Sequence, residues 1–285
     1  MPDIVLATLN AKYVHASLGL RYLYANLGEL RERATLAEFT LDQRAPDIAE
    51  RLLALQPNVL GLGVYIWNVA ETAHLVATLK QVAPELVIVL GGPEVSHEQG
   101  EQPLVLDADY VIAGPGDLAF RKLCEQLLSG ARPADKIIAA APPALAALQL
   151  PYRYYSDTDI AHRLIYVEAS RGCPFKCEFC LSALDKTAWP FELDRFLREM
   201  DALHARGARH FKFVDRTFNL NVNSSRRILQ FFLERLSDET AATVVQYHYD
   251  AAGRLERKDL GNGVYTLYQY DTAGQLTSLI NYQPD

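Results

Sequence analysis

The sequence contains no long apolar run and no run of basic residues. No segment of its 285 residues reaches the uninterrupted apolar length of a membrane span, and the N-terminus, MPDIVLATLN, has no basic stretch ahead of an apolar one. The formal net charge is -7, which argues against a nucleic-acid-binding surface. We therefore expect a cytoplasmic protein of about two domains that binds neither membranes nor nucleic acids.

Cysteine is also scarce, and its distribution argues against a disulfide framework. There are four cysteines in the whole chain, and a chain of this length builds its core without covalent cross-links. Cys124 lies in the apolar helical pattern FRKLCEQLL, which indicates a core position. The other three, Cys173, Cys177 and Cys180, fall in one short run, RGCPFKCEFC. Reduced thiols agree with a cytoplasmic protein.

The spacing CxxxCxxC is that of a three-thiolate iron-sulfur ligand loop. Cysteine thiolates are the usual protein ligands of a four-iron cluster, so three of them leave one iron open to a small molecule. A structural zinc site of the Cys₃His type is the alternative, with His162, His204 and His210 available in the sequence. None of these histidines stands at a familiar finger spacing, and the sequence has no second close pair of cysteines. The spacing therefore favours a cluster over zinc or free thiols.

The first 130 residues alternate short apolar segments with amphipathic helical patterns. Strands are expected at 3–8, 35–41, 58–64, 86–90 and 109–113, with helices near 17–30, 46–55, 68–82 and 116–129. Strands separated by helices of this length pair in parallel through right-handed crossovers, so the pattern predicts a doubly wound, Rossmann-like α/β sheet. Ligands of such sheets bind at the carboxyl ends of the strands.

Unusual residues follow these strand ends. The segments are NAKYVHASLGL after the first strand, YIWN after the third, GGPEVS after the fourth and AGPGD after the fifth. Gly91 and Gly92 have no side chain and tolerate positive φ, so the backbone there can approach a bulky ligand closely. A plain strand-to-loop turn is the alternative for this pair.

The composition changes after residue 130. Residues 131–163 read as a linker, with an Ala/Pro-rich stretch and a cluster of tyrosines at 152, 154 and 155 that suits packing between domains. Strands at 164–169 and 210–215 then alternate with helices near 191–206 and 223–237. The cysteine loop therefore lies at the carboxyl end of a first barrel strand, which is the face where parallel α/β barrels keep their chemistry.

The cysteine run, with the aromatic Phe179 just before its last cysteine, resembles the radical S-adenosylmethionine (SAM) superfamily. The resemblance implies that Cys173, Cys177 and Cys180 hold a 4Fe-4S cluster, that SAM chelates the open iron, and that Phe179 touches adenine. It also implies that an external reductant supplies one electron and that SAM is cleaved into methionine and a 5'-deoxyadenosyl radical, which abstracts hydrogen from a substrate. The cofactors carry this chemistry and the protein positions them.

The loop after the second barrel strand contains three further candidate residues, Asp215, Arg216 and Asn219. Radical SAM proteins place groups here that meet the amino or carboxylate end of SAM, so the resemblance implies SAM contacts, foremost for Asp215 and Asn219. A solvated loop, with Asn223 as the cap of the next helix, is the alternative.

Four segments of the first half, LNAKYVHASLGL, GVYIWN, LGGPEVS and DYVIAGPGD, together with FKFVDRTFN further on, resemble radical SAM proteins that carry a cobalamin-binding domain. The resemblance covers about residues 1–240. It implies a cobalamin cofactor, with Gly91 and Gly92 beside its nucleotide tail. It also implies that Tyr65, Ile66 and Trp67 lie near the corrin face.

Two departures from cobalamin-ligating domains are visible. Their DxHxxG loop is not present, because Tyr13 stands where the aspartate precedes His15 and Gly19 lies one residue too far along. Gly63 stands where such domains usually carry a serine. We therefore expect His15 to be a hydrogen-bonded loop residue, not the axial ligand. Several members of this class bind cobalamin without a histidine ligand, so the domain assignment stands.

The C-terminal segment contains a repeat with a period of 21 residues. YHYDAAGRL at 247–255 and YQYDTAGQL at 268–276 share the pattern YDxxGxL. The Asp-x-x-Gly element is turn chemistry, so the repeat predicts β-hairpins. It resembles the YD repeats of exported Rhs-type proteins. Because that export conflicts with a reduced cluster, the sequence points to a fusion by rearrangement or assembly error.

We expect four regions in all. They are a cobalamin-binding-like domain (1–130), a linker (131–163), an N-terminal part of a radical SAM barrel (164–240) and YD repeats (241–285). The resemblance implies a barrel of about six strand-helix units, of which two precede residue 240. The expected function is that of a radical SAM enzyme, or a fragment of one, for radical transfer or rearrangement such as methylation of a small-molecule or unknown substrate. A catalytically inert fusion that binds cobalamin or associates through its β repeats is the alternative.

Overall fold

The computed structural model describes residues 1–97, 102–175, 177–178, 180, 188–235, 246–259 and 264–282. The chain divides into two compact units, Met1–Leu220 and Asn221–Asp285. No helix in the described ranges is long and apolar enough to cross a membrane.

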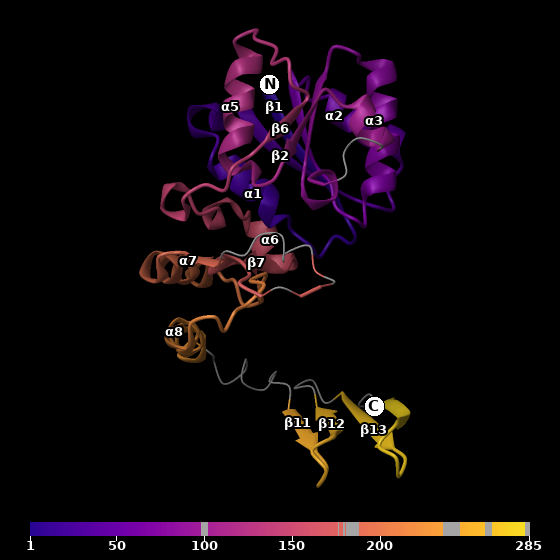
Figure 1. Cartoon of the computed structure of the whole chain (residues 1–285), viewed down its shortest axis with the longest axis vertical. Coiled ribbons are helices and arrows are strands. Elements are labelled where there is room, and N and C mark those ends of the chain that lie inside the picture. The colour runs from indigo at the N-terminus through magenta and orange to yellow at the C-terminus, as the bar shows by residue number, and fades with distance from the viewer. Residues whose placement is uncertain are drawn as a thin grey trace. The chain divides into compact units, whose positions relative to one another are not determined.

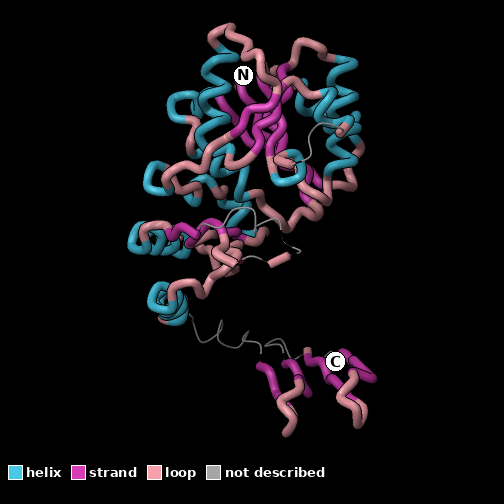
Figure 2. The backbone as a smooth tube through the Cα atoms, in the orientation of Figure 1, coloured by secondary structure: helices cyan, strands magenta, loops and turns pink. Residues whose placement is uncertain are grey.

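A six-stranded parallel sheet forms the centre of the first unit (Figures 1 and 2). Its strands are β1 (Ile4–Asn10), β2 (Ala34–Thr40), β3 (Val59–Gly63), β4 (Val87–Gly91), β5 (Tyr110–Ala113) and β6 (Ile137–Ala139), in the order β2-β1-β3-β4-β5-β6. The first five confirm the predicted strands. The strand order reverses between β1 and β3, and ligands of doubly wound sheets bind at such a switch point.

Helices cover both faces of this sheet, with α1 and α5 on one side and α2 and α3 on the other (Figure 1). The bounds are α1 (Leu18–Ala25), α2 (Ala45–Leu53), α3 (Val69–Val82), α4 (Pro103–Asp107) and α5 (Gly116–Leu128), with 3-10 turns η1 (Gly28–Arg33) and η2 (Pro93–Val95). In β1, Ile4 and Leu6 join the core under α1 and α5, whereas Val5 and Ala7 join the core under α2 and α3. Because both faces are covered, every residue of β1 is buried.

The segment predicted as a linker is more ordered than its composition indicates. It contains β6, which pairs with β5, two further 3-10 turns, η4 (Leu145–Ala147) and η5 (Tyr152–Tyr154), and helix α6 (Asp157–His162). The hydroxyls of Tyr152 and Tyr155 donate to the carbonyls of Glu168 and Tyr166, at 3.0 and 2.7 Å. Both tyrosines are fully buried, so they pack this segment against the strand that follows.

The cysteine loop follows the first strand of a second, smaller parallel sheet in the same unit. Strands β7 (Ile165–Val167) and β10 (Phe211–Phe213) pair in parallel, and α7 (Leu193–Ala205) connects them. A short antiparallel pair, β8 (Ser170–Gly172) and β9 (Ala188–Pro190), brackets the loop. In the described part of the chain, β7 and β10 form a two-stranded parallel sheet and not a closed barrel.

The second unit contains helix α8 (Val222–Leu233) and a four-stranded antiparallel sheet. The helix cap is Asn221, whose side chain accepts from the N–H groups of Asn223 and Ser224. The prediction of Asn223 as the cap is therefore wrong by two residues, because the helix begins earlier than the periodicity indicated. The strands are β11 (Gln246–Tyr249), β12 (Leu255–Asp259), β13 (Tyr265–Tyr270) and β14 (Leu276–Tyr282).

The two YDxxGxL copies form the same turn. In the first, Asp250 Oδ1 accepts from the N–H groups of Ala252 and Arg254, both at 2.9 Å. In the second, Asp271 Oδ1 accepts in the same way at 2.9 and 2.8 Å, again from the residues two and four positions on. Gly253 and Gly274 have φ of 77° and 82°, a conformation that favours glycine. The 21-residue period is thus a structural repeat.

Candidate functional site

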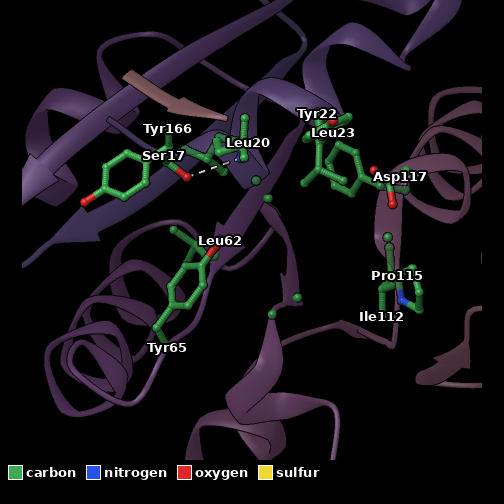
Figure 3. Close-up of a pocket in the computed structure, with 18 of the residues that line it drawn as sticks. Ser17, Leu20, Tyr22, Leu23, Leu62, Tyr65, Ile112, Pro115, Asp117 and Tyr166 are labelled. Carbon is green, nitrogen blue, oxygen red and sulfur yellow. Dashed lines mark hydrogen bonds between the residues drawn. The ribbon is translucent and has the colours of Figure 1, made fainter. Parts of the chain in front are cut away.

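A cavity of about 620 Å³ lies at the carboxyl edge of the six-stranded sheet. Its wall includes Asn10 at the end of β1, Gly63 at the end of β3 and Gly91 at the end of β4. Figure 3 shows Tyr65 and Tyr166 on one side of this cavity and Tyr22 with Asp117 on the other. The size is that of an ordinary small-molecule site, and its position at the β1/β3 switch point is the one that the sheet topology predicts.

The two glycines predicted to contact a ligand both line the cavity, but the lack of a side chain has a different consequence at each. Gly92 has φ of +117°, and a Cβ there would overlap the carbonyl oxygen of Val64. The protein itself therefore requires glycine at this position. A Cβ on Gly91 would meet nothing closer than the carbonyl oxygen of Ile112 at 4.0 Å. The missing side chain of Gly91 leaves room in the cavity instead.

We expect Gly92→Ala and Gly91→Ala to differ in stability. Gly92→Ala should lower the free energy of unfolding by about 1 to 3 kcal/mol, because alanine is strained at that φ and clashes with the backbone. Gly91→Ala should stay within about 0.5 kcal/mol of the parent chain. Urea denaturation followed by circular dichroism measures both changes. Equal losses would show that the strain at Gly92 is not the cause.

Two aromatic residues after β3, Tyr65 and Trp67, also line the cavity. The rings of Tyr65 and Trp67 stack at 4.5 Å with an interplanar angle of 5°. Asn68 fixes this turn, because its Oδ1 accepts from the Tyr65 N–H at 2.8 Å and its Nδ2 donates to the carbonyl oxygens of Leu9 and Gly63. Burial raises the pKa of Tyr65. The turn thus offers a flat aromatic surface at the cavity edge.

Two further candidate residues from the sequence, Ile66 and His15, differ in their relation to the cavity. Ile66, which separates Tyr65 and Trp67 in the sequence, is 76% exposed and does not line the cavity. His15 does line it, and its Nδ1 forms a 2.6 Å hydrogen bond with the Tyr166 hydroxyl. The backbone of His15 also pairs with Leu164. One ring nitrogen of His15 is therefore bonded to a residue of β7 that lies 151 positions away, and not to the local partner that was expected.

A group of charged residues forms the part of the wall next to β7. Arg171 donates from Nη1 to Asp117 Oδ2 at 2.9 Å and from Nε to Glu168 Oε1 at 2.7 Å. Burial raises the pKa of Glu168. Burial lowers the pKa of Arg171, but the two carboxylates outweigh it and the net shift is upward. None of these three residues was singled out from the sequence, although Asp117 stands in the AGPGD segment and Arg171 just before the first cysteine of the loop.

The three cysteines of the loop form no disulfide. Cys173 is half-buried, with its Sγ 3.2 Å from the Thr217 hydroxyl, whereas Cys177 and Cys180 are exposed. The Cys180 N–H donates to the Cys177 carbonyl at 3.1 Å. Within the described ranges, no three His, Cys, Asp or Glu side chains are arranged to hold a metal ion. The donor chemistry nevertheless fits a cluster, since three thiols outside any disulfide come from one loop. Phe179 lies outside the described residues.

Asp215 and Asn219 follow β10, as predicted, but neither lines the cavity. Asp215 Oδ1 and Oδ2 accept from the Ala169 N–H at 3.1 and 3.0 Å, and Oδ1 accepts from the Ser170 hydroxyl at 2.6 Å. The carboxylate thus joins the end of β10 to the start of the cysteine loop. Asn219 is exposed. Contact of either residue with SAM stays a prediction.

Two protein families match separate parts of the chain. The B12 binding domain matches residues 4–124, and the RHS repeat matches residues 249–282. An uncharacterized methyltransferase of Pyrococcus horikoshii is 26% identical over 254 residues, which cover 78% of this chain and 53% of that protein. The cobalamin-dependent radical SAM methyltransferase TokK of Streptomyces tokunonensis is 28% identical over 176 residues, or 52% of this chain and 25% of TokK.

A solved structure shows the same fold over most of the chain. It is the radical SAM methyltransferase TsrM of Kitasatospora setae, with a TM-score of 0.58 and 17% identity, covering 82% of this chain and 51% of TsrM. These matches confirm the resemblance seen in the sequence: a B12 binding domain, the beginning of a radical SAM barrel and an Rhs repeat. The chain spans about half the length, or less, of the relatives named here.

Proposed function

We propose that this chain, which joins a B12 binding domain and the beginning of a radical SAM barrel to an Rhs repeat, is the cofactor-binding part of a cobalamin-dependent radical SAM enzyme. Its reaction is radical-based group transfer, with methylation as the first candidate because the named relatives are methyltransferases. One observation carries the proposal. The cavity at the sheet edge is lined by Arg171, two residues before Cys173, so the cofactor pocket and the cysteine loop share a wall.

Cobalamin is the proposed ligand of this cavity. Gly91 and Gly92 allow its nucleotide tail to lie against the backbone of the strand end, and the stacked Tyr65 and Trp67 offer an apolar surface to the corrin. His15 is not proposed as an axial ligand, because the DxHxxG loop of cobalamin-ligating domains is not present in the sequence. Together with a reducible cluster and SAM, cobalamin supplies one-electron and radical chemistry. The glycines and aromatic rings of the protein bind and orient it.

The loop is the proposed site of the 4Fe-4S cluster, with Cys173, Cys177 and Cys180 as its thiolate ligands. Three thiols that lie outside any disulfide and follow a parallel strand end support this assignment. SAM completes the site, with contacts to Phe179 and to the groups after β10. The proposal includes an external reductant and a small-molecule or unknown substrate. We also propose a cytoplasmic location, because a cluster of this kind needs reduced thiols.

A catalytically inert fusion is the second candidate. Two parallel barrel strands, β7 and β10, are present in the described part of the chain, and the named relatives extend well beyond the matched region. The cavity and the β repeats do not depend on a closed barrel, so an inert fusion would still bind cobalamin or associate through the repeats.

We propose the predicted boundary at residue 130 as the end of the cobalamin-binding part. β6 then extends its sheet from the following segment.

Cofactor binding by the full chain separates the two candidates. Hydroxocobalamin titrated into the chain should saturate at one equivalent, and anaerobic reconstitution with iron and sulfide should give charge-transfer absorption. With SAM and dithionite, the enzyme should then release 5'-deoxyadenosine. Cobalamin binding without 5'-deoxyadenosine would favour the inert fusion. Absence of both cobalamin and cluster would contradict the whole proposal.

Trp67→Ala tests the assignment of the corrin surface. The variant should weaken hydroxocobalamin binding about tenfold, because it removes the stacked aromatic surface at the cavity edge. Ile66→Ala is the matched control, since the adjacent Ile66 is exposed and does not line the cavity. Spectrophotometric titration measures both dissociation constants. Equal affinities for the two variants would remove Trp67 from the site.

A further inference from the structure

The base of the cysteine loop is held by very little backbone pairing. β8 and β9 contribute three residue pairs, with Arg171 opposite Trp189 and Gly172 opposite Ala188. Such a short ladder does not by itself fix the direction of the loop that it brackets. The position of the loop therefore depends on side-chain contacts at its base.

Arg171, the central residue of β8, makes those contacts in several directions. Its guanidinium bonds Glu168 at the end of β7 and Asp117 in the first turn of α5, which is 54 positions away in the chain. One face of the guanidinium lies 4.3 Å from the centre of the Tyr22 ring. The side chains of Asp117 and Glu168 are 7% and 12% exposed. Charge-assisted bonds with little solvent around them are strong, and the planar fork fixes the guanidinium orientation as well as its position.

These contacts connect the cofactor cavity to the loop. Asp117, Glu168, Tyr22 and Arg171 all line the cavity. Cys173 follows two residues later, within at most about 7 Å of chain. A molecule in the cavity is thus held against the same side chains that anchor the first cysteine.

We infer that Arg171 is a positioning residue that sets the geometry between the cobalamin pocket and the cluster loop, with Asp117 as its partner on the B12 binding domain. This inference rests on the proposed function. Arg171 acts through the backbone of Ser170–Gly172 and is not a cluster ligand. Lysine cannot replace it, because an ammonium group does not offer two donors in a fixed plane to two carboxylates.

The first test uses hydrogen exchange on the full chain without cofactors. In Arg171→Met, amides of residues 169–172 should exchange about tenfold faster than in the parent chain, with a smaller increase in Asp117→Asn and in Arg171→Lys. Arg121→Met is the matched control, because the Arg121–Glu125 pair of the same helix α5 is about half exposed. Circular dichroism checks the fold of each variant. If Arg171→Met does not fold, the exchange rates of residues 169–172 in Asp117→Asn and in Arg121→Met test the role of the ion pair instead.

The second test reads the cluster after anaerobic reconstitution. The parent chain and Arg121→Met should show the same iron content and the same change in the electron paramagnetic resonance signal of the reduced cluster on adding SAM. Arg171→Met should retain the iron content but lose or broaden this change. Unchanged exchange and an unchanged signal in Arg171→Met would overturn the inference. If the parent chain itself takes up no cluster, the proposed function fails. The hydrogen-exchange rates of residues 169–172 then decide by themselves whether Arg171 positions the loop.

Discussion

Cys177→Ala is expected to abolish assembly of the iron-sulfur cluster. Three thiolates are the fewest that hold a four-iron cluster with one iron open, so two leave a second iron without a protein ligand. Cys177 is exposed and free, so its replacement removes a ligand without opening a cavity in the core. Iron and sulfide content per chain after anaerobic reconstitution should fall to the background of a cysteine-free protein.

The chain supplies its own control for this experiment in Cys124. This thiol is fully buried in α5, and burial raises its pKa to about 12. It is therefore protonated at neutral pH and out of reach of iron. Cys124→Ser should leave iron content unchanged. Iron content that is unchanged in Cys177→Ala would reject the loop as the cluster site, and equal losses in both variants would indicate non-specific iron binding.

The chain's local patterns predict most of the elements but not the contacts that close the site. β1, β3 and β4 are apolar runs bounded by turn residues, so their positions follow from short-range sequence. β6 was missed because it has three residues, two of them exposed, beside an Ala/Pro-rich stretch. The predicted helix at 17–30 ends at Ala25 instead, and a 3-10 turn begins at Gly28, whose φ is +61°.

In the candidate site, some residues could be predicted from the sequence and some contacts could not. Gly91 and Gly92 were predicted from their place after a strand end, whereas Tyr65 and Trp67 followed from the family resemblance. The structure brings all four to one cavity. The Asp117–Arg171 bond joins α5 to β8 across 54 positions of the chain, and nothing within either segment indicates it. Charged residues are mostly exposed, so a sequence gives no sign of which ones fold into a buried pair.

A second buried ion network gives the other large expected effect. Arg21 of α1 is 3% exposed and donates from Nη2 to Glu38 of β2 at 2.9 Å and to Asp159 of α6 at 2.8 Å. Arg163 bonds the same two carboxylates, at 2.9 and 3.3 Å. Two arginines thus neutralise two carboxylates and connect the first helix of the B12 binding domain to the segment that precedes β7. Removing one arginine leaves a buried negative charge without compensation.

Arg21→Met is therefore expected to lower the free energy of unfolding by about 3 to 5 kcal/mol at neutral pH. Methionine keeps most of the side-chain volume, so the loss reports the charge and not a cavity. Arg44→Met is the control, since Arg44 bonds Asp47 at the surface with 79% of its side chain exposed, and its loss of stability should be far smaller than that of Arg21→Met. Urea denaturation followed by circular dichroism measures both. Equal small losses would show that the network contributes no more than a surface pair.

The pH dependence of this loss identifies its cause. Burial raises the pKa of Asp159, but Arg21 and hydrogen bonds from Ser156 outweigh burial and hold it below its ordinary value. In the parent chain, the stability from this carboxylate is present above its unfolded pKa and is lost as the pH falls through the folded value. Without Arg21, burial dominates and the folded pKa rises, so protonation stabilises the variant. The difference between Arg21→Met and the parent should therefore shrink from pH 7 to about pH 4. A loss that stays constant over this range would point to packing instead of charge.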